Sequence, residues 1–254
     1  MNILFTICGR AGSKGFKNKN LKEMNGVPLV YYTLATLKGF TDRYTDGQVR
    51  VALNTDSKEL ADVVAKQTVV QDVVFIDRKL ELAGDVVAKV EVIKDTYLQV
   101  KGDFAADVVI DVDITSPMRT ITDLEEVLRV YQSNSKYDLV YSVVESRRSP
   151  YFNMVEIKDD GFFRKICASN FTARQQAPLC YELNASIYAY RPDFLSGEIS
   201  KTILDYNCGI SLMRDYLVLD IDSEDDFHMM SMLHRYYCEV DEGIREVYEI
   251  ARKF

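Results

Sequence analysis

The sequence has little of what structural metal sites and disulfide-bonded proteins require. It contains two histidines, His228 and His234, and their spacing of six residues in a helical stretch is poor for a shared metal. We expect both histidines at the surface or partly packed. The five cysteines are scattered and form no CxxC pair; they are Cys8, Cys167, Cys180, Cys208 and Cys238. This pattern argues against structural zinc and a disulfide framework, and it favours a reducing cytoplasm.

Positive charge and long apolar runs are also scarce. The chain has 31 Lys and Arg against 39 Asp and Glu, which gives a net charge of -8. Such a balance argues against a general nucleic-acid or anionic-membrane partner. No apolar run approaches the ~20 residues that cross a bilayer. Linkers, low-complexity segments and repeats are lacking too, so we expect one domain over residues 1–254, with 47% hydrophobic residues to form its core.

Apolar, β-rich runs alternate with amphipathic helical patterns over the first 144 residues. The strands are predicted at 3–8, 49–54, 73–76, 108–112 and 139–144, and the helices at 28–38, 57–67, 86–100 and 122–134. Ser57 is expected to cap the second helix, and Thr122 with Glu125 the fourth. This alternation predicts a doubly wound α/β fold with a mainly parallel sheet and helices on both faces.

The pattern changes after Pro150. Residues 151–191 carry short strand-like pieces, turns, and many polar and aromatic residues. We interpret this region as an inserted arm at about 147–184, followed by a return to the sheet at 185–190. Residues 225–254 are predicted to be helical.

A glycine-rich basic loop, GRAGSKGFKNKN, directly follows the first predicted strand. Ligands of doubly wound sheets bind beyond the carboxyl ends of the strands, where this loop would lie. Gly12 and Gly15 would allow a tight turn with backbone N–H groups around an anion. Arg10, Lys14, Lys17 and Lys19 would add positive charge, which indicates a triphosphate more than a single phosphate. A solvated basic loop is the alternative. The loop fits neither the Walker pattern nor G-x-G-x-x-G, so neither a P-loop ATPase nor a dinucleotide-binding oxidoreductase is indicated.

Carboxylates follow two apolar runs at alternate positions. Asp111 and Asp113 end one run, and Asp220 and Asp222 follow another at 217–219. Residues two apart in a strand point the same way, and paired carboxylates suit Mg²⁺ with phosphate partners. The alternatives are a helix cap for the second pair and hydrogen bonds to loop N–H groups for the first.

Seven short motifs occur in one order along the chain. They are Arg10–Gly15 with Lys19 and Asn20, Asn25–Leu29, Asn54–Ser57, Arg78 with 80–85, Thr115–Arg119, Asn184–Tyr188, and Asp220–Glu224 with Asp226 and Phe227. In sequence and order they resemble the signature motifs of the acylneuraminate cytidylyltransferases, or CMP-sialic acid synthetases. The resemblance covers nearly the whole chain, and it implies the fold of the nucleotide-diphospho-sugar transferases.

The resemblance also implies an activity. Members of this family transfer CMP from CTP to the anomeric hydroxyl of an eight- or nine-carbon 2-keto sugar acid and release pyrophosphate, with Mg²⁺ as cofactor. Attack on a triphosphate requires charge neutralisation, alignment and stabilisation of the leaving group. The alternatives are a nucleotidyltransferase for another sugar acid or a sugar phosphate, and a non-catalytic homologue that binds nucleotide.

The resemblance assigns roles to particular positions. The catalytic candidates are Arg10, Lys14, Lys19 and Asp222. The nucleotide-binding candidates are Arg10, Gly12, Ser13, Lys14, Asn20, Arg78, Asp85 and Lys89, with helix capping as the alternative for Asp85. The sugar-binding candidates are Asp113, Thr115, Ser116, Arg147, Arg148, Arg174, Gln176 and Asn184. The candidate metal ligands are Asp220, Asp222, Asp113 and Asp111.

Three positions depart from the pattern of the sialic acid enzymes. Asp113 stands where the family has a glutamine, Glu182 stands near an arginine position, and Lys89 replaces a small hydroxyl residue. The chain instead resembles a bacterial branch whose members activate other nonulosonic acids, such as legionaminic acid. The arginines of residues 147–174 are then the candidates for the sugar carboxylate, because guanidinium binds it in a bidentate fashion. The family arm packs on a second subunit, so a homodimer with an arginine acting in trans is implied.

Overall fold

The centre of the protein is a seven-stranded sheet. The computed structural model describes residues 1–12, 15–84, 86–215 and 220–254. The strand order is β11-β7-β10-β6-β1-β4-β5, and every neighbouring pair is parallel except the two that β10 makes. The strands are β1 (Ile3–Gly9), β4 (Val49–Thr55), β5 (Val74–Asp77), β6 (Val108–Val112), β7 (Leu139–Glu145), β10 (Tyr181–Tyr190) and β11 (Cys208–Leu212). A short hairpin, β2 (Glu23–Met24) with β3 (Val27–Pro28), follows the opening loop.

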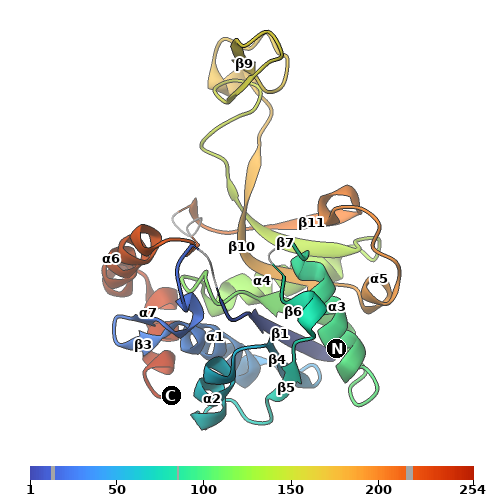
Figure 1. Cartoon of the computed structure of the whole chain (residues 1–254), viewed down its shortest axis with the longest axis vertical. Helices are drawn as coiled ribbons and strands as arrows, with labels where there is room; N and C mark the ends of the chain where they lie inside the picture. Colours follow the sequence, from blue (N-terminus) through green and yellow to red (C-terminus); the bar gives the residue numbers. More distant parts are fainter. Residues whose placement is uncertain (13–14, 85, 216–219) are drawn as a thin grey trace.

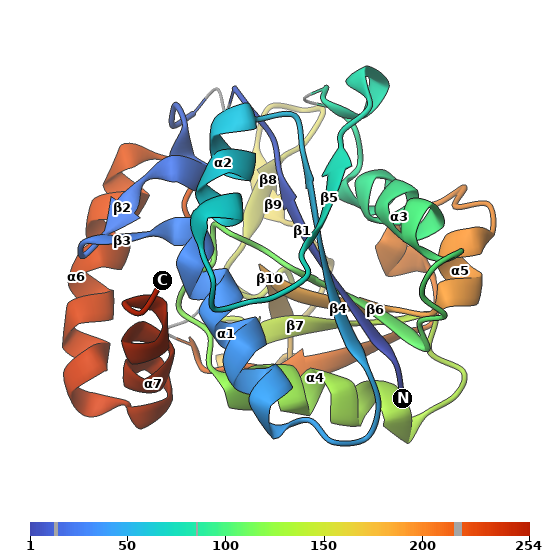
Figure 2. The same ribbon diagram turned by 90° about the horizontal axis from the view of Figure 1, so that it is seen from below.

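Helices cover both faces of this sheet, as Figure 2 shows. One face carries α1 (Leu29–Arg43), α2 (Lys58–Lys66), α4 (Ile121–Ser133), α6 (Glu224–Val240) and α7 (Glu242–Ala251). The other carries α3 (Lys89–Val100) and α5 (Pro192–Ser196). Short 3₁₀ turns lie at Lys19–Leu21, Leu80–Leu82, Arg174–Gln176 and Ile203–Asp205. The predicted doubly wound α/β architecture is confirmed.

The two faces have separate cores because successive strand residues point in opposite directions. Ile3, Phe5 and Ile7 of β1 pack with the helices of the α1 face. Leu4 packs on the other face with residues of α3. A continuous apolar run in β1 is therefore required, since the strand is central and buried on both sides.

Several predicted boundaries were wrong. Helix α4 is capped by Thr120 with Asp123 in the capping box, two residues before the expected cap. The C-terminal helical region is broken into α6 and α7 at Asp241, whose side chain accepts from the amide of Ile244. Strand β10 begins at Tyr181, four residues before the predicted return to the sheet. Sequence patterns identified neither α5 nor β11, because both are short.

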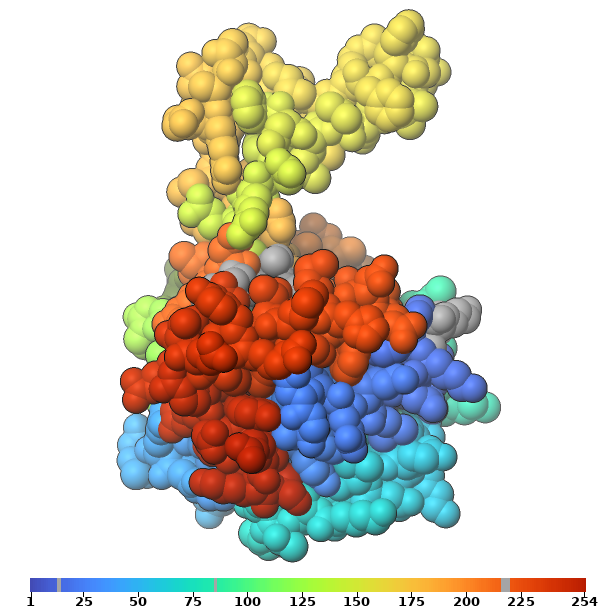
Figure 3. All heavy atoms as spheres, turned by 90° about the vertical axis from the view of Figure 1, so that its left-hand side faces the viewer, coloured from blue at the N-terminus to red at the C-terminus, as the bar shows by residue number. Residues whose placement is uncertain are grey.

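The segment between β7 and the inner part of β10 projects from the body as an arm (Figures 1 and 3). Its tip is a two-stranded hairpin, β8 (Val155–Ile157) with β9 (Phe163–Lys165). The pairing of β10 with β7 shifts register between Leu183 and Tyr188, where Ala185 has a φ of 52°. This irregularity lies where the arm joins the sheet. Within the described residues, no helix is both long and apolar enough to cross a membrane.

Candidate active site

A pocket of about 590 Å³ lies at the carboxyl ends of the central parallel strands. Its lining comes from the opening loop, the segment between β5 and α3, the end of β6 and the loop before α6; the residues are Cys8, Arg10, Gly15, Phe16, Lys19, Asn20, Arg78, Leu82, Gly84, Val87, Lys89, Val92, Asp113, Thr115 and Asp222. This is the position where doubly wound sheets bind their ligands. Most of the residues expected on the nucleotide and catalytic side are thus brought together.

The opening loop is fastened at both ends. The amide of Ala11 donates to Asp56 Oδ1 at 2.8 Å, and Asn20 Nδ2 donates to the carbonyl of Arg10 at 3.4 Å. A Cβ on Gly15 would lie 2.6 Å from the carbonyl oxygen of Asp222, so this close approach requires glycine. Gly12 has a φ of 73° but does not line the pocket. Ser13 and Lys14 lie outside the described residues.

Lys19 joins the opening loop to the loop before α6. Its Nζ donates to the carbonyl of Ile221 at 2.9 Å and to Asp222 Oδ1 at 2.8 Å. The side chain of Asp222 is 74% exposed, so one carboxylate oxygen contacts Lys19 while the group still faces the pocket. The two catalytic candidates therefore form an ion pair at the pocket edge.

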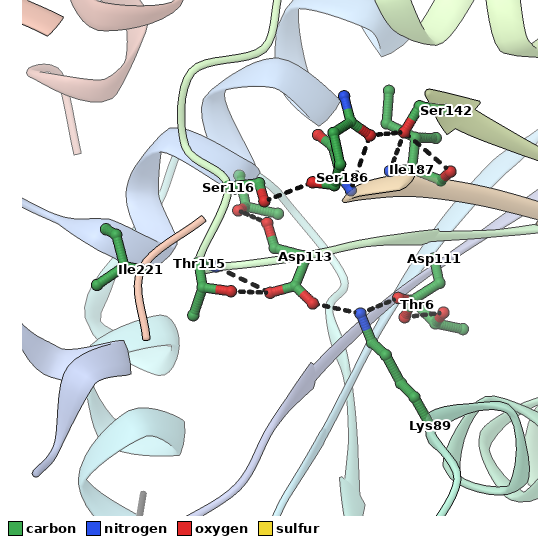
Figure 4. Close-up of polar contacts among 12 residues, drawn as sticks. Thr6, Lys89, Asp111, Asp113, Thr115, Ser116, Ser142, Ser186, Ile187 and Ile221 are labelled. Atoms are coloured by element: carbon green, nitrogen blue, oxygen red, sulfur yellow. Dashed lines mark hydrogen bonds and ion pairs between the residues drawn. The ribbon is translucent and has the colours of Figure 1, made fainter. Parts of the chain in front are cut away.

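Lys89 lies between two of the candidate metal ligands (Figure 4). Its Nζ is 2.6 Å from Asp111 Oδ2 and 2.5 Å from Asp113 Oδ2. The second oxygen of Asp111 accepts from Thr6 Oγ1 at 2.8 Å. The second oxygen of Asp113 accepts from the amide and the hydroxyl of Thr115 at 2.9 and 2.8 Å. All four carboxylate oxygens thus have partners within the chain, which argues against the expectation of a metal on Asp111 and Asp113.

The protonation states of this cluster follow from its charges. Burial disfavours the ammonium of Lys89, but the carboxylates of Asp111 and Asp113 outweigh it and raise the pKa of Lys89 well above its usual value. Burial likewise opposes ionisation of Asp113, but Lys89 and the Thr115 donors lower its pKa. Lys89 and Asp113 are therefore charged at neutral pH.

A second cation, Arg119, lies beneath residues 113–116 and does not line the pocket. Arg119 is fully buried and donates to the carbonyls of Asp113 and Ser116, to Ser186 Oγ at 3.0 Å and to Thr33 Oγ1 at 3.3 Å. Burial lowers the pKa of Arg119 to about 10 despite the nearby carboxylates. This arginine belongs to one of the seven sequence motifs, in which no role was expected for it; in the structure it anchors residues 113–116.

The loop before α6 carries the other carboxylate pair. Burial, then the carboxylates of Asp222 and Asp113, raise the pKa of Asp220. The shift therefore reflects first the partial burial of Asp220 and then the neighbouring carboxylates, which Lys19 offsets only in part. Ser223 caps α6 through the amide of Asp226, so capping does not use Asp220 or Asp222. Residues 217–219, where a strand was expected, lie outside the described residues.

The opposite wall is shaped by Arg78 and by apolar side chains. Arg78 donates from Nε to Asn54 Oδ1 at 2.9 Å and from Nη2 to the Asn54 carbonyl at 3.0 Å. Leu82 and Val87 complete this wall, and sequence reasoning assigned neither a site role. Cys8, expected in the core, is only partly buried and also lines the pocket. Asp85 lies outside the described residues; helix α3 begins at Lys89.

Most sugar-binding candidates lie away from the pocket lining. Ser116 and Asn184 are buried, and the Ser116 hydroxyl donates to the Asn184 carbonyl at 3.2 Å. At the arm, Arg147 Nε donates to Asp215 at 2.6 Å, and Arg174 Nη2 donates to the Ser146 carbonyl at 2.9 Å. Gln176 Oε1 caps its own turn through residues 172 and 173. Arg148 does not line the pocket either, so one chain alone does not bring these arginines to the phosphate side.

Solved structures define the class of protein to which this fold belongs. A structure of CMP:2-keto-3-deoxy-manno-octonic acid synthetase complexed with CTP superimposes with a TM-score of 0.65 at 15% identity, covering 93% of this chain and 99% of that one. The 4-diphosphocytidyl-2C-methyl-D-erythritol synthase of Anaerococcus prevotii gives a TM-score of 0.60 at 15% identity, over 92% and 98% of the two chains. The fold is that of the nucleotide-diphospho-sugar transferases.

Sequence comparison then identifies the family. A family model described as Cytidylyltransferase matches residues 4–206. The "CMP-N,N'-diacetyllegionaminic acid synthase" of Campylobacter jejuni is 35% identical over 233 residues, or 91% of this chain and 94% of the relative. An "N-acylneuraminate cytidylyltransferase" of Streptococcus agalactiae is 25% identical over 89% of this chain and 52% of its own length. The chain belongs to the cytidylyltransferase family, and it is a nucleotidyltransferase.

Proposed function

We propose that this cytidylyltransferase transfers CMP from CTP to the anomeric hydroxyl of a nonulosonic acid and releases pyrophosphate. The observation that carries the proposal is the pocket, in which Arg10, Lys19 and Arg78 face Asp222 at the strand ends. Cations in the pocket lining suit a triphosphate, and a carboxylate at the edge suits a divalent metal. The proposal treats residues 1–254 as one domain with an arm at about 147–184.

The opening loop supplies the phosphate contacts in this proposal. Arg10 and Lys19, with Ser13, Lys14 and the loop amides, neutralise the triphosphate and the leaving pyrophosphate. Asn20 is buried against the Arg10 carbonyl and keeps the loop in place. On the other wall, Arg78 and the apolar side chains of Leu82 and Val87 enclose the nucleoside. Arg78 is already oriented by Asn54, so it loses little freedom on binding.

Asp220 and Asp222 are the residues that would hold Mg²⁺. In the described part of the chain, no three acidic, histidine or cysteine side chains lie close enough to bind a metal by themselves. Mg²⁺ usually takes one or two carboxylates and completes its shell with phosphate oxygens and water. Burial and then the carboxylates of Asp222 and Asp113 raise the pKa of Asp220, and a bound cation would offset both effects. Bound there, Mg²⁺ would supply charge stabilisation for the transferred phosphoryl group.

The sugar acid is placed between the phosphate site and the arm. Asp113 and Glu182 stand at positions where an acid would repel an unshielded substrate carboxylate. Asp113 is shielded by Lys89 and Thr115, and Glu182 accepts from the Ser146 hydroxyl. We therefore infer a 5,7-diamino-type nonulosonic acid, such as legionaminic acid, in place of N-acetylneuraminate. The 35% identity to a CMP-N,N'-diacetyllegionaminic acid synthase supports this branch.

The arm supports a homodimer. Its tip exposes large apolar side chains, with Phe162 at 67%, Phe163 at 69% and Ile157 at 63% exposure. Exposed apolar clusters of this kind mark interaction surfaces. A second copy is the proposed occupant, because the arm carries sugar-binding candidates that do not line the pocket of their own chain. In the dimer, an arginine among Arg147, Arg148 and Arg174 would complete the partner's site.

Pyrophosphate release tests the reaction directly. The purified protein is incubated with Mg²⁺, one of four nucleoside triphosphates, and one of a panel of nonulosonic and octulosonic acids. We expect release with CTP far above that with UTP, ATP or GTP, and at least tenfold higher kcat/KM for legionaminic acid than for N-acetylneuraminate. Tenfold corresponds to about 1.4 kcal/mol of differential transition-state binding. Equal rates with all triphosphates would refute the cytidine assignment, and a preference for N-acetylneuraminate would refute the sugar assignment.

A further inference from the structure

The Lys89 ammonium lies between the carboxylates of Asp111 and Asp113. The arrangement resembles a metal-binding site in which a side chain of the protein itself supplies the positive charge. The Nζ–oxygen distances are 2.6 and 2.5 Å. Both are close, charge-assisted ion-pair contacts. Asp111 is fully buried at the strand end, so its charge has no access to water. A buried carboxylate needs a counter-charge or must be protonated.

The structure offers Asp111 little besides Lys89. Thr6 donates one hydrogen bond to Oδ1, and Oδ2 accepts no other hydrogen bond from the described residues. Asp113 lies in the pocket lining, whereas Asp111 lies behind it. Lys89 is at the first position of α3, and its side chain is 35% exposed toward the pocket. It therefore connects the buried carboxylate with the one that faces the substrate.

We propose that Lys89 is an internal cation that takes the place of a divalent metal between Asp111 and Asp113. It positions Asp113 by holding Oδ2 while Thr115 holds Oδ1. It also closes this pair to divalent ions, so that the metal of the reaction is confined to the side of Asp220 and Asp222. Lys89 is in this view a positioning residue for the Asp113 carboxylate.

The proposal predicts that removing the ammonium creates a metal site. In Lys89→Ala, both carboxylates lose the ammonium that contacts them, and the space left by its side chain opens toward the pocket; Arg119 is nearby but donates to the Asp113 carbonyl and not to these carboxylates. Carboxylate oxygens bind Mn²⁺ and Ca²⁺ well, and two acidic groups favour a divalent ion strongly over water. Lys89→Arg keeps the positive charge and should gain no such site.

The test measures Mn²⁺ binding to the protein in the absence of nucleotide. Electron paramagnetic resonance of the free Mn²⁺ reports the amount bound, and thermal unfolding reports the effect of the metal on Tm. We expect Lys89→Ala to bind one more Mn²⁺ per chain than the wild type, at least tenfold more tightly, and to gain a metal-dependent rise in Tm. Lys89→Ala/Asp111→Asn should lose both effects. Lys79→Ala is the matched control, because Lys79 pairs with the single carboxylate of Asp95 outside the pocket lining.

Three outcomes would overturn the proposal. In the first, Lys89→Ala binds no more Mn²⁺ than the wild type. In the second, Lys89→Ala/Asp111→Asn binds as much Mn²⁺ as Lys89→Ala. Alternatively, Lys89→Ala would stay unfolded at every Mn²⁺ concentration while Lys89→Ala/Asp111→Asn folds, which would mean that Lys89 only neutralises a buried acid. The inference concerns the pocket of the proposed function, but its readout needs neither CTP nor a sugar. Failure of CMP transfer and failure of this inference are therefore distinguishable.

Discussion

Lys19 Nζ lies 2.8 Å from Asp222 Oδ1, and this contact joins the opening loop to the carboxylate proposed for Mg²⁺. The two residues are separated by most of the chain, and the fold brings them to one edge of the pocket. The pair is largely exposed on the Asp222 side, so it contributes little to stability. In the proposed mechanism, this contact would hold the cation for the leaving group and the ligand for the metal in fixed relation.

The first prediction concerns Asp222→Asn. This substitution keeps the shape of the side chain but removes one charge from the proposed metal site. We expect pyrophosphate release at least tenfold slower at a fixed Mg²⁺ concentration, with partial recovery at higher Mg²⁺, while thermal stability stays nearly unchanged. Steady-state kinetics against Mg²⁺ concentration measure this. Asp225→Asn, an exposed carboxylate in the first turn of α6, is the control and should behave as wild type; full wild-type activity in excess chelator would remove the metal from the mechanism.

The second prediction concerns Arg119→Met. The guanidinium is fully buried and satisfies the carbonyls of Asp113 and Ser116, which an apolar side chain leaves without donors. We expect a loss of about 3 kcal/mol in the free energy of unfolding, as for other broken buried polar networks. Denaturant unfolding measures it. Arg129→Met, which breaks an exposed pair with Glu126, should cost under about 0.5 kcal/mol; an equal loss in both variants would contradict the anchoring role of Arg119.

The third prediction concerns the arm. Replacing Phe162 and Phe163 by serine removes the most exposed aromatic side chains of its tip. We expect the double variant to run as a monomer by light scattering and to lose activity, while Leu204→Ser, on the body, stays dimeric. A monomeric wild type would refute the homodimer.

Mixed dimers test whether an arm residue acts in trans. Asp222→Asn and Arg174→Ala each damage one function, and a dimer of one copy of each contains one undamaged composite site if Arg174 serves the partner. We expect each variant alone to be weakly active and their mixture to recover part of the wild-type rate. No recovery after subunit exchange, shown by native mass spectrometry, would place Arg174 outside the partner's site. The same pairing with Arg147→Ala or Arg148→Ala distinguishes the three arginines.

The fourth prediction concerns pH and His234. The sequence analysis expected this residue at the surface or partly packed; it is in fact buried, against Tyr32 and Tyr248, with Nδ1 3.0 Å from Asn25 Nδ2. Burial lowers the pKa of His234 from 6.5 to about 4. Between these pH values His234 is protonated in the unfolded chain but neutral in the folded protein. The free energy of unfolding therefore falls as the pH drops from about 6.5 to about 4. The full shift corresponds to about 3 kcal/mol.

The pH dependence of denaturant unfolding measures this effect. His234→Gln should flatten the dependence between pH 6.5 and 4, whatever its effect on stability at pH 7. His228→Gln is the control, because His228 is 67% exposed and should leave the slope unchanged. An unchanged slope in His234→Gln would assign the acid sensitivity to carboxylates instead.

The sequence by itself determined the layers of the fold and the identity of the loops at its active edge. Alternation of apolar strands and amphipathic helices is a local signal, so the parallel sheet and most helices were predictable from residues 3–144. The opening loop, Asp113 and Asp222 were identified because glycines, basic residues and paired carboxylates carry their chemistry in the residue type, whereas Arg78 was identified only through the resemblance to a known family. The sequence pattern predicted the ends of helices and strands less well. Thr120 and not Thr122 caps α4, because either threonine can cap a helix and the choice depends on packing.

The tertiary structure alone decided which charges meet. Lys89 and Asp113 are 24 residues apart in sequence, and only the packing of α3 on the sheet places an ammonium between two carboxylates expected to bind metal. The same holds for Arg119, for the buried His234, and for Arg147, Arg148 and Arg174, which do not line the pocket of their own chain. Local sequence encodes propensity and period, whereas the partner of a charge depends on contacts between distant segments, which form only when the sheet and its helices assemble.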